Sequence, residues 1–216
     1  MNFVRKVLGI VAAQLTLTFT MCLASAANAG FGNFMNRVDV AIYTLVGLIV
    51  TISMLACTKE WRFAVPWNYL LLLVATICEA SSVAAMTAKF EVGAVLSAIF
   101  VLAITLVCLF ASSFFVKESR RLQQAMVGSM FVASIATLFI VPFILMSTYG
   151  KNYEWAWVAL ACVGCFLSAI YVIYDLLVIM DLALVAQDEY ILAAFMLYAD
   201  IVRLFIYILI LLSEKK

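Results

Sequence analysis

The sequence contains no histidine and few charged residues: Asp, Glu, Lys and Arg make up 12% of its 216 positions, while 68% are hydrophobic. Without histidine, the chain lacks the commonest metal ligand and the usual proton switch near neutral pH, so a pH response has to come from carboxyl groups. A soluble domain carries about 25% charged residues, and this chain has too few polar residues to cover a wet surface. The composition therefore predicts a membrane protein.

Proline and glycine are also scarce, with 2 and 8 residues, which argues against disordered or linker-rich segments. The net charge of +1 and the lack of a basic face argue against a nucleic-acid partner. All six cysteines lie in apolar runs, and Cys162-Val-Gly-Cys165 has the spacing of a redox or zinc pair. Because no second pair and no histidine completes a zinc site, we interpret the cysteines as packing residues. We expect no metal site and no cofactor.

Polar boundaries divide the chain into seven apolar runs, at about 4–29, 38–57, 67–88, 92–116, 123–148, 155–186 and 189–213. A membrane-spanning helix needs about 20 apolar residues, so each run is long enough to cross the bilayer. We interpret the first run as a retained helix, because it is too long for the apolar region of a usual signal peptide. The sequence thus predicts an all-α, polytopic membrane protein: a bundle of seven transmembrane helices forming one domain over residues 1–216.

The distribution of basic residues predicts an orientation. With the N-terminus inside, the inner segments hold seven of them: Arg5, Lys6, Lys59, Arg62, Lys117, Arg120 and Arg121. The outer segments hold five: Arg37, Lys89, Lys151, Lys215 and Lys216. Since basic residues are enriched on the inner side of membrane proteins, this bias favours an inside N-terminus.

Four ionisable side chains lie well within apolar runs: Glu79, Asp175, Asp200 and Arg203. Each costs about 2.5–3.5 kcal/mol at the centre of a spanning helix, so such residues are normally paired or functional. They are the residues on which any chemistry of this chain should depend.

Asp175 and Asp200 are placed to meet at one depth of the bundle. They are 25 residues apart on successive predicted helices, and their midpoint falls between Gln187 and Asp188, the most polar point of the segment. In an antiparallel hairpin both carboxyl groups would then stand about 18 Å from the turn. This requires the sixth helix to continue to about residue 186; an end near Met180 would leave the carboxyl groups out of register.

Two carboxyl groups at one depth in a medium of low dielectric constant cannot both ionise cheaply, so one proton is shared between them. Such a pair can sense protons without histidine. The alternative is that each aspartate merely pairs with a neighbour.

The last two helices resemble the signature helices of the Bax-inhibitor family of membrane proteins. The matching stretches are Ile-Tyr-Val-Ile-Tyr-Asp at 170–175 and Glu-Tyr-Ile-Leu-Ala-Ala-Phe-Met-Leu-Tyr-Ala-Asp-Ile-Val-Arg-Leu-Phe at 189–205. Weaker matches are Val-Arg-Lys-Val at 4–7, Ala-Gln-Leu at 13–15, Pro-Trp-Asn-Tyr-Leu-Leu-Leu at 66–72 and Glu79. The resemblance implies a bundle of seven helices with the last one central, and a pH-sensitive calcium leak governed by a pair of aspartates. In eukaryotic members it also implies suppression of cell death from internal membranes.

By position, the resemblance assigns the proton sensor to Asp175 and Asp200, and makes Glu79 the family's acidic residue in the third helix. Arg203 departs from the pattern, which usually has asparagine three residues after the last aspartate. At that spacing Arg203 shares a helix face with Asp200, and a fixed cation there favours ionised carboxylates. A salt-bridge cluster that holds a pore shut is then an alternative to a proton-sharing pair; Arg203 could otherwise extend to the outer interface.

Three further residues are candidates for the pore or gate. Glu79 either lines a polar path with Ser81 and Ser82 or shares a proton with nearby acceptors. Lys59 and Arg62 either contact the aspartate pair as gating groups or serve as ordinary inside anchors, which is the simpler interpretation.

These features support a pH-sensitive calcium or cation leak, with calcium ions, protons and the lipid bilayer as partners. The alternative is a non-conducting subunit of a larger membrane assembly, in which Asp175, Asp200 and Arg203 hold helices together. An intramembrane aspartyl protease is disfavoured, because a basic neighbour is wrong for a dyad that must hold one proton; we expect no enzyme. The sequence predicts an internal membrane (ER, Golgi or mitochondrial inner) in a eukaryote and the inner membrane in a bacterium.

Overall fold

The structure, a computed structural model, describes residues 2–57, 64–117, 154–180 and 190–212. These ranges fold as helices α1 (Asn2–Ala27), α2 (Ala29–Met35), α3 (Val38–Cys57), α5 (Trp67–Thr87), α6 (Val92–Lys117), α8 (Glu154–Met180) and α9 (Tyr190–Leu212). All except α2 are long and apolar enough to cross a membrane, giving six candidate spans. The predicted all-α, polytopic membrane protein is therefore confirmed. The expected span at 123–148 and the end of the expected span at 155–186 lie outside the described residues.

The first apolar run is divided in two, where the sequence predicted one helix over 4–29. Helix α1 ends at Ala27, and Asn28 adopts an extended conformation with φ −117° and ψ 106°. The Asn28 side chain accepts hydrogen bonds from the backbone N–H groups of Gly30 and Phe31, so it caps the short helix α2. An asparagine that satisfies free N–H groups in this way favours a new helix start over continuation of the previous helix.

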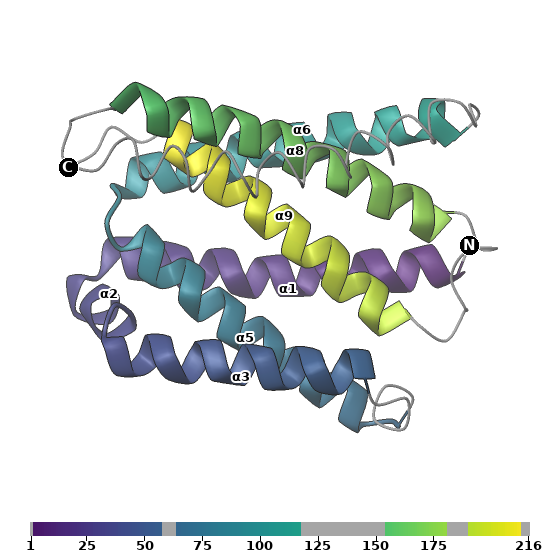
Figure 1. Cartoon of the computed structure of the whole chain (residues 1–216), viewed down its shortest axis with the longest axis horizontal. Coiled ribbons are helices and arrows are strands. Elements are labelled where there is room, and N and C mark those ends of the chain that lie inside the picture. Colours follow the sequence, from purple (N-terminus) through teal and green to yellow (C-terminus); the bar gives the residue numbers. More distant parts are fainter. Residues whose placement is uncertain (1, 58–63, 118–153, 181–189, 213–216) are drawn as a thin grey trace.

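Helix α9 is central, as predicted for the last helix. It packs against α8, α1, α6 and α5, and Figure 1 shows it crossing the middle of the bundle between the layer of α6 and α8 and the layer of α1 and α5. Its buried side chains are Ile191, Ala194, Phe195, Leu197, Tyr198, Ile201, Val202, Leu204, Phe205, Ile208 and Leu209. The burial extends around most of the helix, as expected of one enclosed by other helices.

Helix α3 lies at the edge of the bundle and packs mainly on α5. Its large apolar side chains are largely exposed, among them Ile42, Tyr43, Leu45 and Ile49. Such a surface would aggregate in water. In a bilayer it contacts hydrocarbon, which agrees with the span assigned to this helix.

Helix α9 packs on α8 at Gly164 through the ring of Tyr207. A Cβ atom added there would overlap the ring of Tyr207 on α9. Only a residue without a side chain fits, because interiors are close-packed. Gly164 lies within the Cys162-Val-Gly-Cys165 motif, in which Cys162 is exposed and Cys165 is half-buried, and both are free thiols.

Candidate functional site

The structure brings Asp175 of α8 and Asp200 of α9 together. Their carboxyl groups lie within hydrogen-bonding range of each other, and both side chains are partly buried. The two helices are neighbours in the bundle. The continuation of the sixth helix to about residue 186, on which the predicted equal depth depends, lies outside the described residues and stays a prediction.

One oxygen of this pair has no partner. Oδ2 of Asp175 is fully buried and accepts no hydrogen bond. A buried acceptor left in this way costs about 1–3 kcal/mol. A proton shared with the neighbouring Asp200 would satisfy it, because a protonated carboxyl group is a donor.

Arg203 forms an ion pair with Asp200. Its Nη1 donates to Oδ1 of Asp200 at 2.7 Å, and the two residues are three positions apart on α9. The Asp200 side chain is 14% exposed and the Arg203 side chain 54% exposed. Asp200 thus lies between a carboxyl group on α8 and a guanidinium group on its own helix.

Glu79 approaches the same place from α5. Its carboxyl group is half-buried and lies within Coulombic range of Asp200 and Arg203. Ser81 and Ser82 each donate their hydroxyl proton to a carbonyl of their own helix, Ile77 and Cys78 respectively. Neither serine therefore donates to Glu79. We call Glu79, Asp175, Asp200 and Arg203 the carboxylate cluster.

Two predicted site residues, Lys59 and Arg62, lie outside the described residues. Their role as gate or anchor stays a prediction. Within the described ranges, no three His, Cys, Asp or Glu side chains gather in a way that could hold a metal ion.

A set of buried polar contacts that was not predicted from the sequence lies beside the carboxylate cluster. Gln14 Nε2 donates to Thr76 Oγ1 at 2.7 Å, and the hydroxyl groups of Thr18 and Tyr198 lie 2.7 Å apart. We call Gln14, Thr18, Thr76 and Tyr198 the polar seam; it joins α1 to α5 and α9. Gln14 and Thr18 are one helical turn apart on the same face, which is the signal that could have revealed the seam.

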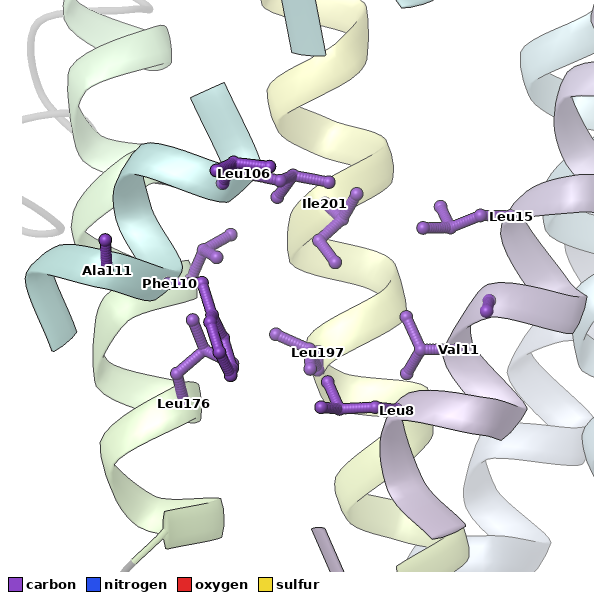
Figure 2. Close-up of a pocket in the computed structure, with 12 residues that line it drawn as sticks. Leu8, Val11, Leu15, Leu106, Phe110, Ala111, Leu176, Leu197 and Ile201 are labelled. Atoms are coloured by element: carbon purple, nitrogen blue, oxygen red, sulfur yellow. The ribbon is translucent and has the colours of Figure 1, made fainter. Parts of the chain in front are cut away.

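An apolar groove of about 660 Å³ lies between α1, α6, α8 and α9. Figure 2 shows side chains from these helices converging on it, among them Leu8, Phe110, Leu176 and Leu197. All of its lining side chains are apolar. The side chains that line the groove therefore offer no ligand to an ion.

Known proteins match this chain along nearly its whole length. The family model described as "Inhibitor of apoptosis-promoting Bax1" matches residues 1–216. The chain is 22% identical to Protein lifeguard 3 of Homo sapiens, over 99% of this chain and 69% of that protein. It is 27% identical to Protein lifeguard 4 of Mus musculus, over 97% of this chain and 83% of that one. It is also 27% identical to Protein LIFEGUARD 2 of Arabidopsis thaliana, over 98% and 87% of the two chains.

Proposed function

Because this chain belongs to the Bax-inhibitor family, whose members are non-enzymatic membrane proteins, we propose that it is a proton-regulated cation leak with calcium as the permeant ion. Asp175 and Asp200 act as the proton sensor, and Arg203 modulates them as an ion-pair partner. Glu79 supplies a further carboxyl group to the path.

The observation that carries this proposal is the contact between the carboxyl groups of Asp175 and Asp200, with one buried oxygen left unpaired. Gain or loss of a single proton changes the interaction between α8 and α9 from a hydrogen bond to a repulsion. Since α9 also packs on α1, α5 and α6, a shift of α9 reaches most of the described helices. A titrating pair at this place is therefore suited to control a path through the bundle.

The test is to measure calcium flux across the membrane of vesicles into which the purified full-length chain has been inserted. We expect flux that depends on pH in the wild type, and flux without this pH dependence in Asp175→Asn and Asp200→Asn. Asp39→Asn is the matched control, because Asp39 is an exposed carboxylate at the start of α3, paired with Arg37 at 2.9 Å. Absence of pH-dependent flux in the wild type, or an unchanged response in both cluster variants, would contradict the proposal.

The ion pair between Arg203 and Asp200 favours a second function, that of a non-conducting membrane subunit. There the cluster holds helices together, and other membrane proteins are the partners. Arg203→Asn separates the two functions. A leak held shut by the ion pair gains flux in this variant, whereas a structural subunit conducts neither before nor after the substitution and loses thermal stability.

The cellular setting belongs to the same proposal. The chain has its N-terminus inside, in an internal membrane if the source is eukaryotic and in the inner membrane if it is bacterial. In a eukaryote it suppresses cell death, as the name of the matching family suggests. Protection of expressing cells against a death stimulus, lost in Asp200→Asn, is the corresponding measurement.

A further inference from the structure

The polar seam and Glu79 form a buried polar region of the bundle. In this region the oxygen atoms that can accept a hydrogen bond outnumber the hydroxyl groups that can donate one. Two contacts between α1 and α5 give their relative direction. Gln14 of α1 meets Thr76 of α5, and Ser25, which lies later in α1, donates to the carbonyl of Ala84, which lies later in α5. These two helices are therefore parallel. Glu79 lies three residues beyond Thr76, about 4.5 Å along the axis, and Thr18 lies four residues beyond Gln14, about 6 Å along it.

Spacings of three and four residues also keep side chains on one helix face. Glu79 and Thr18 thus lie on the same helix faces as Thr76 and Gln14, at nearly the same depth as each other and about one helical turn beyond the Gln14–Thr76 contact. Tyr198 joins them at this level through its 2.7 Å contact with Thr18, and the charge of Glu79 acts on the Tyr198 hydroxyl group.

Every hydroxyl proton of the seam is already used. Thr76 donates to the carbonyl of Leu72 at 2.7 Å, so its oxygen can only accept from Gln14. Thr18 donates to the carbonyl of Gln14 at 2.9 Å, so Tyr198 must be the donor to Thr18. Each hydroxyl group has one proton to give, and none is left for another acceptor.

The acceptors, by contrast, are not all satisfied. Because the amide nitrogen of Gln14 has to face Thr76, its Oε1 points away from that contact. The residue is only 5% exposed, and Oε1 is buried without a partner. The Tyr198 oxygen and the Glu79 carboxyl group add further acceptor capacity. A buried acceptor normally meets a donor, an ordered water or an ion.

The charges of the carboxylate cluster also favour a bound cation. It holds three carboxyl groups, Glu79, Asp175 and Asp200, and one guanidinium group, Arg203. Arg203 compensates one negative charge through Asp200, and a proton shared by the aspartates compensates a second. Glu79 is the carboxyl group left without a compensating charge among the described residues of the cluster, and buried charges are normally paired.

The geometry points to a binding site for a small monovalent cation, with sodium as the matching ion, between α1, α5 and α9. Its ligands are Gln14 Oε1, the Tyr198 hydroxyl oxygen and the Glu79 carboxylate. Hard cations take oxygen ligands of this kind. A single carboxylate balances one positive charge, and the described residues offer no cluster of three acidic or thiol ligands for a more highly charged metal. This site does not require the chain to conduct.

The test is the thermal stability of the purified full-length protein in detergent, with sodium replaced by choline at constant ionic strength. A ligand that binds only the folded state raises Tm, by about 3–6 °C at ten times its Kd for a chain of this size. We expect this rise with sodium in the wild type, and its loss in Gln14→Leu and in Glu79→Gln. Ser97→Ala, which removes an exposed hydroxyl group on α6, is the control and should keep the full rise.

The wild-type measurement decides the proposal even if a variant fails to fold. Equal Tm values in sodium and choline would overturn it. Gln14 Oε1 would then accept a hydrogen bond from a water molecule or from a protonated Glu79. A larger rise with calcium than with sodium, or a sodium response kept in both Gln14→Leu and Glu79→Gln, would overturn it as well. Asp175→Asn separates this site from the proposed leak: it leaves the ion pair between Asp200 and Arg203 in place, so it should lose the pH dependence of flux and keep the sodium response.

Discussion

At the scale of single residues, Tyr198 and Asp200 give α9 polar contacts with two neighbouring helices, α1 and α8. Two positions along an α-helix correspond to a rotation of about 200°, so the two side chains leave opposite sides of α9. Tyr198 meets Thr18 of α1, and Asp200 meets Asp175 of α8. The polar seam and the carboxylate cluster therefore both include a residue from the same turn of α9.

The hydrogen bond between Tyr198 and Thr18 should stabilise the bundle measurably. Tyr198→Phe and Thr18→Val each remove one partner, and we expect each to lower the free energy of unfolding by about 0.6–1.7 kcal/mol, the range for polar contacts between membrane helices. The double variant should cost less than the sum of the two, as measured by detergent-induced unfolding.

Thr105→Val is the matched control for this cycle. The Thr105 hydroxyl group is exposed and donates only to the carbonyl of Val101 in its own helix. It should leave the free energy of unfolding nearly unchanged. Strict additivity of Tyr198→Phe and Thr18→Val would show that the two hydroxyl groups do not interact.

The contact between Asp175 and Asp200 could be predicted from the sequence because it depends on local arithmetic: two helices, one turn and equal distances from it. The contact between Gln14 and Thr76 could not. These residues are 62 positions apart on parallel helices that another span separates in the chain. Their pairing depends on how α1 and α5 rotate about their axes, which packing of the whole bundle decides.

At the scale of helices, Gly164 determines how closely α8 approaches α9. Gly164→Leu places a side chain where the ring of Tyr207 lies, so either that ring or the two helices must move. We expect a loss of about 1–3 kcal/mol in the free energy of unfolding, as for other overpacked interiors. The thermal unfolding of the purified protein measures this.

Gly93→Leu provides the comparison, because a Cβ at Gly93 on α6 meets nothing within 4 Å. It should be nearly neutral or slightly stabilising, since glycine is a poor helix former. Equal losses in the two glycine variants would mean that the close approach at Gly164 has no energetic importance.

The helix boundaries were predicted well where polar residues interrupt the apolar runs and poorly where the interruption is small. Asn28 is a single polar residue among alanines, so hydropathy alone extended the first span beyond it. Its capping preference was the available signal. Similarly, the spacing of Cys162 and Cys165 suggested chemistry, whereas the glycine between them carries the structural role.

At the scale of the whole molecule, pH should change the distance between α8 and α9. With one proton on the pair, Asp175 and Asp200 attract each other through a hydrogen bond. Loss of that proton as pH rises leaves two carboxylates, of which Arg203 compensates only one. We therefore expect the two helices to move apart as pH increases.

Spin labels measure this change when placed at exposed positions on the two helices, Phe166 on α8 and Met196 on α9, with the native cysteines replaced. The distance between the labels should increase with pH in the parent protein and stay constant in Asp200→Asn. A constant distance in the parent, or the same increase in the variant, would contradict a proton sensor at this pair.

The central position of α9 has a consequence for biosynthesis. A ribosome makes a chain from its N-terminus, so α1, α5, α6 and α8 are made before the helix that packs between them. Until α9 arrives, the faces of α1, α5, α6 and α8 that pack on it lack their partner. The newly made chain thus passes through an intermediate in which these faces are not yet covered by α9.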